Sequence, residues 1–295
     1  MQFQGAFTAL VTPFRNGAVD EERYRAFIEW QIEQGINGLV PCGTTGESAT
    51  LTHQEHKDVI RICVEQVKGR VPVLAGAGSN NTREAVELTR YAKQAGADGA
   101  LLITPYYNKP TQEGLYQHFK AVAAAIKIPL IVYNVPGRTG TNILPEPVHR
   151  LSRLRNVAGI KEAAGDVAQI DTLVRLIKKD RPDFAILSGN DDQAFHLVNS
   201  GGDGVISVLS NVMPRETSDM IRLALAGEVE KARELHHRMF PLMKNLFMES
   251  NPIPVKYAVN RLGLCRNELR LPLVPASEKC MAVIDESLKE CGVSL

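Results

Sequence analysis

The sequence of 295 residues lacks several features that would assign it to a class at once. Its net charge is only +1, so no basic surface for nucleic acid is expected. It has no run of 18 apolar residues, so we expect no membrane-spanning helix. The stretch MQFQGAFTALVTPF has neither a basic start nor a long apolar core, and we expect no signal peptide. These absences favour a globular cytoplasmic protein.

Cysteine is scarce and shows no pairing motif. The five cysteines lack a C-x-x-C spacing and stand at positions 42, 63, 265, 280 and 291. An odd, scattered set predicts free thiols in a reducing compartment. A G-x-G-x-x-G motif after the first apolar run is also missing, and the GAG at 76–78 is read as a tight turn. This absence disfavours an open, doubly wound sheet, which is the alternative fold.

Short apolar runs, each bounded by glycine or proline, recur along the chain and alternate with amphipathic segments. Eight of them are predicted to be buried parallel strands: 5–11, 38–41, 71–75, 99–103, 129–132, 157–160, 184–187 and 203–207. Helices are predicted between them, most clearly at 82–95, 111–126 and 214–226, while Asp20 and Thr52 are N-cap candidates for two more. Eight strand–helix units in about 225 residues predict an α/β fold, a closed (β/α)8 (TIM) barrel.

The last part of the sequence contains no clear strand. Three helices are predicted there, at 229–247, 254–262 and 276–290. We therefore expect two domains, a catalytic barrel at 1–226 and a three-helix domain at 227–295. A helical unit of this size can cover a flank of the barrel or form an oligomer contact.

The most informative stretch is 128–163, where two apolar runs each end in polar residues. The second run, 157–160, is followed by Lys161. A lysine at the end of a buried strand is partly desolvated, which lowers its pKa from about 10.4 towards neutrality. Such an amine can form a Schiff base with a carbonyl compound. The alternative is a surface lysine that caps a strand, and the spacing by itself leaves both interpretations open.

Further polar groups follow the other predicted strands, at the end of the barrel where enzymes of this fold carry out chemistry. These residues are Thr44, Thr45, Tyr106, Tyr107, Tyr133, Arg138, Lys161, Asn190 and Ser207. The turn at 43–46 could hold a carboxylate with its N–H groups and hydroxyls, or be an ordinary capped turn. Tyr133 is a proton carrier if it lies near Lys161, and a packed aromatic residue otherwise. Arg138 offers a fork for a second carboxylate, or is a solvated loop charge.

Two histidines, His53 and His56, are three residues apart on one predicted helical face. No third ligand stands in evident register with them, so a zinc site is disfavoured. The remaining groups form a simple set: a lysine nucleophile, hydroxyls that move protons, and cationic and N–H groups for carboxylates. That set describes Schiff-base chemistry on a small keto acid.

Four motifs, in this order, resemble the pyruvate-dependent class I aldolase family, which includes N-acetylneuraminate lyase. They are GTTGES at 43–48, YNVPGRTG at 133–140, GIKEA at 159–163 and GVIS at 204–207. The likeness runs from Phe7 to the C-terminal helices and includes NPIPVK at 251–256. It implies a (β/α)8 barrel with a C-terminal helical domain, and a lyase that needs no metal or organic cofactor.

Within the family, the chain resembles members that condense pyruvate with L-aspartate 4-semialdehyde on the route to diaminopimelate and lysine. The resemblance implies that Lys161 forms the Schiff base with pyruvate and that Tyr133 donates and accepts protons. Thr44 and Tyr107 would complete the proton relay, with Tyr107 reaching in from a neighbouring subunit. Tyr107 in the relay implies at least a dimer, and the family resemblance implies a homotetramer, a dimer of dimers.

The same resemblance implies the substrate contacts. Thr45, Gly189 and the backbone of Ile206 would contact pyruvate, and Arg138 would bind the carboxylate of the semialdehyde. The sugar-acid aldolases of the family generally lack this arginine, so an N-acetylneuraminate or other sugar-acid aldolase is the second choice. A non-catalytic regulator that binds keto acids is the alternative from another class. Loss of the lysine or a relay tyrosine would favour it, but Lys161, Tyr133 and Tyr107 are present.

A second group of residues, polar except for Ala49, follows the second, third and fourth predicted strands. These positions resemble an inhibitor site for L-lysine in feedback-inhibited members, and they are Ser48, Ala49, His53, His56, Asn80, Glu84 and Tyr106. Glu84 could pair with a cationic amine. The alternative is a capped helix start with solvated polar residues.

Overall fold

The computed structural model describes residues 3–293, so the predicted outer domain limits, residues 1 and 295, lie outside it. Eight parallel strands form the centre: β1 (Gly5–Ala9), β4 (Gly38–Val40), β5 (Leu74–Gly76), β6 (Gly99–Ile103), β7 (Leu130–Asn134), β8 (Val157–Glu162), β9 (Ala185–Ser188) and β10 (Gly204–Ser207). Their order is β4-β1-β10-β9-β8-β7-β6-β5. A parallel bridge between Leu39 and Val73 joins the two outer strands. The sheet closes on itself, and the predicted (β/α)8 barrel is confirmed.

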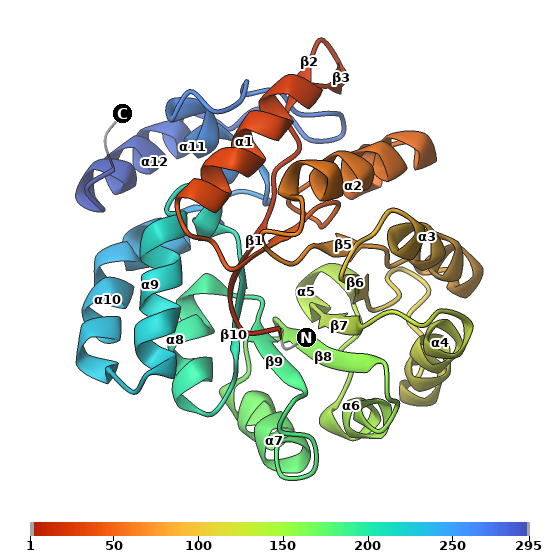
Figure 1. Cartoon of the computed structure of the whole chain (residues 1–295). Coiled ribbons are helices and arrows are strands. Elements are labelled where there is room, and N and C mark those ends of the chain that lie inside the picture. Colours follow the sequence, from red (N-terminus) through yellow and green to blue (C-terminus); the bar gives the residue numbers. More distant parts are fainter. Residues whose placement is uncertain (1–2, 294–295) are drawn as a thin grey trace.

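Helices surround the strands in a ring (Figure 1). They are α1 (Glu21–Glu33), α2 (His53–Val67), α3 (Thr82–Gln94), α4 (Gln112–Ala125), α6 (Pro145–Ser152), α7 (Val167–Ile177), α8 (Asp191–Asn199) and α9 (Pro214–Leu225). Both predicted N-caps are confirmed: the Asp20 side chain accepts a hydrogen bond from the Arg23 amide, and Thr52 forms a capping box with Glu55.

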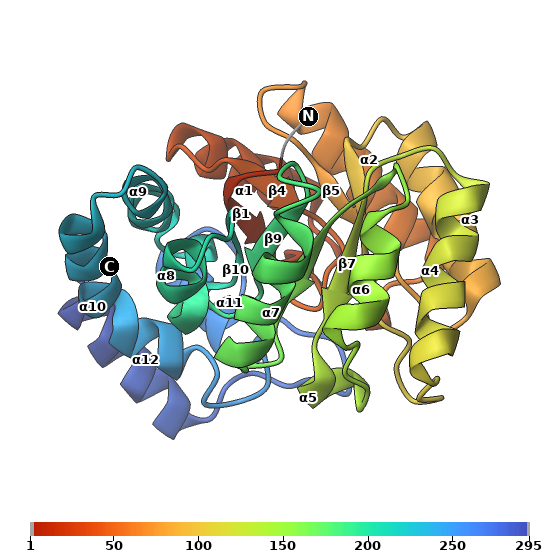
Figure 2. The same cartoon turned by 90° about the horizontal axis from the view of Figure 1, so that it is seen from below.

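Three further helices follow the barrel: α10 (Val229–Asn245), α11 (Ile253–Arg261) and α12 (Glu278–Glu290). Helix α10 packs against α8, α9 and α12, and α11 packs against α12. Figure 2 shows α10 and α12 standing beside the barrel as an outer layer. The division into domains at residue 226 stays a prediction. Among residues 3–293, no helix has both the length and the apolar character that crossing a membrane requires.

Some small elements were not predicted. They are the hairpin β2 (Phe14–Arg15) and β3 (Ala18–Val19), the short helix α5 (Pro136–Thr139), and single 3-10 turns at Ser48–Thr50 and Leu209–Asn211. Several predicted strand ends were also wrong. Strand β1 stops at Ala9 and β5 begins only at Leu74, whereas β7 continues through Asn134 and β8 through Glu162. Hydrogen bonding between neighbouring strands continues after the apolar run has ended, so polar residues take part in the sheet.

The interior of the barrel is filled with side chains. Residues that share one apolar cluster there are Phe3, Phe7, Val40, Leu74, Leu101, Ile131, Leu187 and Ile206. The packing is tight enough that a Cβ atom on Gly38 would lie 2.2 Å from the Phe7 ring. Because the interior is closed, a cavity can form only at an end of the barrel, where the polar residues after the strands gather.

Candidate active site

Lys161 and Tyr133 lie side by side on neighbouring strands at the carboxyl end of the barrel. Strands β7 and β8 pair with Tyr133 opposite Lys161, and the Lys161 Nζ atom is 4.2 Å from the centre of the Tyr133 ring. Lys161 is only 5% exposed, so it is not a surface lysine. Burial lowers its pKa to about 7, an effect that Arg138 assists and the carboxylate of Asp191 opposes. A large fraction of the amine is therefore unprotonated at neutral pH.

Tyr133 is buried as well, and this keeps its phenol in the protonated form. Burial raises the pKa of Tyr133, while the positive charge of Arg138 and the hydroxyl of Thr44 lower it in part. The phenol can thus donate a proton close to the Lys161 amine. The predicted grouping of Tyr133, Thr44 and Lys161 is found in the structure.

A small cavity of about 50 Å³ opens above these side chains. Its lining includes Gly43, Thr44, Thr45, Tyr133, Arg138, Lys161, Gly189, Asn190 and Asn251. Most of the predicted catalytic and pyruvate-binding residues thus meet in one place. Ile206 and Ser207 do not line the cavity, and both are fully buried. Either could contact a ligand only through its backbone or after a rearrangement.

Gly189 leaves space for the stem of the lysine. A Cβ atom at this position would lie 3.0 Å from Cε of Lys161 and 2.7 Å from Cβ of Ala163. A larger residue would therefore displace the Lys161 side chain.

Sequence reasoning missed Asp191, the first residue of α8. Its carboxylate is buried and accepts hydrogen bonds from the amides of Val208 and Leu209, at 3.0 and 2.9 Å. Burial raises the pKa of Asp191, and the nearby Lys161 amine opposes that shift. The available signal was an aspartate directly after Asn190, at the end of the seventh predicted strand.

Asn251, which precedes α11, was also missed as a site residue. Its side-chain amide donates to the Thr45 hydroxyl at 3.0 Å, and its carbonyl accepts from the Arg138 guanidinium at 3.2 Å. The only signal was its place in the NPIPVK motif, which entered as part of the family resemblance.

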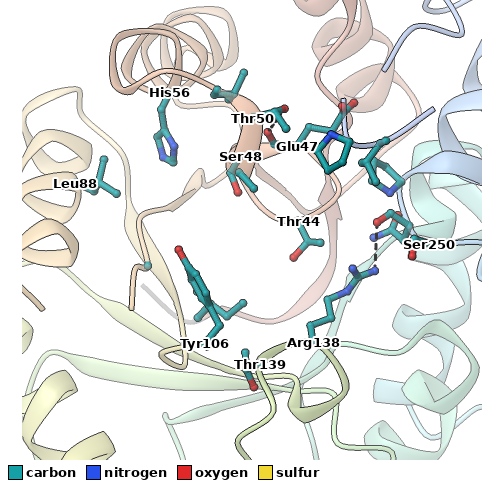
Figure 3. Close-up of a pocket in the computed structure, with 18 of the residues that line it drawn as sticks. Thr44, Glu47, Ser48, Thr50, His56, Leu88, Tyr106, Arg138, Thr139 and Ser250 are labelled. Carbon is teal, nitrogen blue, oxygen red and sulfur yellow. Dashed lines mark hydrogen bonds between the residues drawn. The ribbon is translucent and has the colours of Figure 1, made fainter. Parts of the chain in front are cut away.

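A larger cavity of about 550 Å³ adjoins the small one and shares Thr44 and Arg138 with it (Figure 3). The residues expected at the inhibitor site that line it are Ser48, Ala49, His53, His56, Glu84 and Tyr106. Asn80 does not line this cavity, but its side chain donates to the Tyr106 carbonyl at 3.2 Å. Figure 3 shows Ser48 and His56 on the side of the cavity opposite Tyr106.

Charged and polar groups of this cavity already contact one another. The Glu84 carboxylate lies 3.3 Å from Nε2 of His53 and accepts a hydrogen bond from the Ser79 hydroxyl. Nε2 of His56 lies 2.7 Å from the Gly76 carbonyl, and burial lowers the pKa of this histidine. His56 is therefore neutral at pH 7 and donates its Nε2–H to that carbonyl.

Tyr107 lines neither cavity. It is 90% exposed and has a φ angle of 71°, in the left-handed region. The structure of this one chain does not bring Tyr107 to Tyr133 or Thr44. Its expected role in the relay of a neighbouring subunit stays a prediction.

Comparison with known proteins agrees with this geometry. The model of the dihydrodipicolinate synthetase family matches residues 2–291. This chain belongs to that family. A curated 4-hydroxy-tetrahydrodipicolinate synthase from Nitratidesulfovibrio vulgaris (strain Miyazaki F) is 63% identical over 294 residues, which cover 99% of this chain and 100% of the relative.

Solved structures of the family have the same fold. The chloride-inhibited dihydrodipicolinate synthase from Acinetobacter baumannii, complexed with pyruvate, is 45% identical with a TM-score of 0.96. The enzyme from Cyanidioschyzon merolae with lysine bound is 38% identical with a TM-score of 0.95, and each alignment covers 99% of both chains. The expected lyase activity, that of a 4-hydroxy-tetrahydrodipicolinate synthase, is confirmed by these full-length relatives. They do not support a sugar-acid aldolase or a non-catalytic regulator.

Proposed function

We propose that this chain condenses pyruvate with L-aspartate 4-semialdehyde through a Schiff base on Lys161. The observation that carries the proposal is the buried Lys161 amine, with a pKa of about 7, beside the Tyr133 phenol in a polar cavity. The activity of the full-length relatives and the pyruvate complex of the Acinetobacter baumannii enzyme support this choice of substrates.

The first half of the reaction activates pyruvate. The Lys161 nitrogen attacks the carbonyl carbon, the oxygen leaves as water, and a protonated imine remains. The protonated imine withdraws electrons from the adjacent methyl group. That methyl group loses a proton, and the imine is thereby converted to an enamine. Tyr133 moves protons in these steps, assisted by the hydroxyl of Thr44. The turn that carries Thr45 holds the pyruvate carboxylate, with Gly189 and the Ile206 backbone nearby.

The second half joins the two substrates. The enamine carbon attacks the aldehyde carbon of the semialdehyde, and the aldehyde oxygen becomes a hydroxyl by taking up a proton. Arg138 binds the carboxylate of this substrate. The amine of the substrate then attacks the imine carbon and expels the Lys161 nitrogen. One water is released overall, and the cyclic product leaves a free lysine. The electron sink is the imine itself, so the proposal includes no cofactor.

Borohydride trapping tests this proposal. With pyruvate present, reduction should add one pyruvate-derived mass per chain, on the peptide that contains Lys161. Lys161→Ala should give no adduct. Label on a different lysine, or turnover with N-acetylmannosamine in place of aspartate semialdehyde, would contradict the proposal.

We further propose that the larger cavity binds L-lysine as a feedback inhibitor. The support is its size, the carboxylate of Glu84 at one wall and the polar groups of His53 and Tyr106 nearby. The lysine-bound Cyanidioschyzon merolae enzyme is consistent with such a site. Because the cavity shares Thr44 and Arg138 with the small one, a bound ligand could alter the catalytic site directly. Calorimetric titration with L-lysine should show binding that Glu84→Ala removes, while the adduct on Lys161 still forms.

The proposed assembly is a homotetramer, built as a dimer of dimers that brings Tyr107 to a neighbouring site. Sedimentation at assay concentration tests it, and a fully active monomer would contradict it. The proposed location is the cytoplasm, in keeping with five cysteines that are free thiols in the structure.

A further inference from the structure

A second lysine, Lys256 on α11, is buried even more completely than Lys161. The side chains of Lys256 and Glu47 are both 0% exposed, and they form an ion pair with each other. The other oxygen of Glu47 accepts a hydrogen bond from the Arg270 amide at 3.1 Å. The Lys256 Nζ atom also lies 4.1 Å from the centre of the Phe14 ring. Both charges are thus paired, and water does not reach either of them.

Such a pair is not an efficient way to stabilise a fold. Removing two charges from water is costly, and an apolar pair of similar volume is often as stable or more stable. The cost is visible at Lys256, because burial lowers its pKa even though the Glu47 carboxylate opposes the shift. The pair joins residues 209 positions apart, from the barrel and from the C-terminal helices. The position of the ion pair, between the barrel and the C-terminal helices, is therefore more informative about its role than its contribution to stability.

Glu47 belongs to the turn that carries Thr44 and Thr45. The turn is bounded by two residues other than glycine in the left-handed conformation, Cys42 with φ 56° and Glu47 with φ 53°. This conformation is uncommon for such residues and persists only where the surroundings hold it. At Glu47 the surroundings are Lys256 and the Arg270 amide.

The same segment makes a second connection to this turn. Asn251 lies five positions before Lys256. Its side chain donates a hydrogen bond to the Thr45 hydroxyl, and its carbonyl accepts one from Arg138. The bond to Arg138 is one of the dashed lines in Figure 3, next to Ser250. The start of α11 thus contacts the turn at Thr45 and at Glu47, two residues apart.

We propose that Lys256 is a positioning residue for catalysis: together with Asn251, it sets the place of the Thr44–Thr45 turn relative to Lys161 by holding Glu47. The inference rests on the proposed function, in which this turn binds the pyruvate carboxylate and assists proton transfer. A shift of about 1 Å in a group that positions substrate can lower the rate by about 10²-fold. Loss of the pair should therefore impair pyruvate binding and imine formation even when the protein stays folded.

The test compares the double variant Glu47→Gln/Lys256→Met with the wild type. Both replacements keep the approximate side-chain volume, glutamine can still accept from the Arg270 amide, and no unpaired charge stays buried. We expect the double variant to melt near the wild-type temperature, well above Lys256→Met alone. We also expect KM for pyruvate to rise at least tenfold and the rate of borohydride-trapped adduct to fall by a similar factor.

Lys178→Met is the matched control. Lys178 forms a mostly buried pair with Asp203, at 2.6 Å, next to the amino end of β10 and away from the cavities. This variant should lose stability and keep the wild-type KM for pyruvate. If Lys178→Met changed KM as much as the double variant does, the effect would be one of general stability and the proposal would be wrong.

Asn251→Ala extends the test if the double variant does not fold. It leaves the ion pair intact and removes the side-chain bond to Thr45 together with one polar group of the cavity lining, so KM for pyruvate should rise with little change in melting temperature. An unchanged KM and trapping rate in folded variants would overturn the inference. Absence of any adduct in the wild type would instead overturn the proposed function, so the two failures are distinguishable.

Discussion

Lys161 and Lys256 are both buried, and both amines lie over an aromatic ring, at 4.2 Å from the Tyr133 centre and 4.1 Å from the Phe14 centre. They differ in their partners. Lys256 contacts the Glu47 carboxylate, whereas Lys161 has no ion pair within residues 3–293 and experiences Asp191 only at longer range. A carboxylate in contact, as Glu47 is for Lys256, favours the charged form of the amine and makes the pair a structural contact. A buried lysine without one can lose its proton and become a nucleophile.

The largest expected effect comes from Lys161→Met, which removes the nucleophile and keeps the volume. Turnover and adduct formation should fall to background, because no other described residue in the cavity is an amine. Stability should not fall, since the variant removes a buried amine that has no carboxylate in contact. Steady-state kinetics and urea unfolding of one preparation measure both quantities. Residual turnover close to that of the wild type would contradict the role of Lys161.

Lys256→Met should produce the opposite pattern in stability. It leaves the Glu47 carboxylate buried without its partner, which typically costs about 3–5 kcal/mol. Urea unfolding should show this loss, and adding Glu47→Gln should recover much of it. If Lys256→Met were as stable as Lys161→Met, the contrast between the two lysines would disappear.

Tyr133→Phe removes the hydroxyl group beside Lys161. The Lys161 amine would then lie over a phenyl ring, as the Lys256 amine lies over Phe14. The variant should fold normally but lose turnover by about 10²-fold or more, as expected when an acid–base group is removed. Circular dichroism and kcat measurements check this. Near-normal kcat would mean that Tyr133 only packs against the lysine.

The smallest effect concerns pH. Lys161 has a pKa of about 7 instead of 10.5, so the rate of imine formation should rise about tenfold per pH unit below 7 and level off above it. Between pH 7 and 10.5 the unfolded state binds the extra proton, so this group makes stability rise with pH across that window. Lys161→Met should remove this component of the stability profile. A trapping rate that kept rising beyond pH 9 would indicate a lysine with an ordinary pKa.

Much of the fold was predictable because it depends on patterns between neighbours in the chain. All eight barrel strands lie within or close to the predicted runs, and the capping residues Asp20 and Thr52 act as expected. The errors lie at strand ends. Apolar composition indicates where a strand is buried, but pairing with the next strand decides where it stops, so Tyr133 and Lys161 belong to β7 and β8.

The candidate site was predictable where one short motif carries each group, as for Thr44, Arg138 and Lys161. The residues that hold these groups in place were not. The Asp191 carboxylate accepts a hydrogen bond from the Val208 amide, directly after β10. Asn251 donates a hydrogen bond to Thr45, which is 206 positions away in the sequence. Nothing in the local sequence around these two residues indicates such partners.

The sequence by itself determined the order of strands and helices, the polar residues at strand ends and the lysine able to react, because these follow from local periodicity and residue chemistry. Only the tertiary structure decided the protonation state of that lysine and the place of the turn opposite it. Both depend on burial and on charges contributed by distant segments. Lys161 has a low pKa because the closed barrel excludes water around it, and Lys256 has a counter-ion because α11 packs against the Glu47 turn.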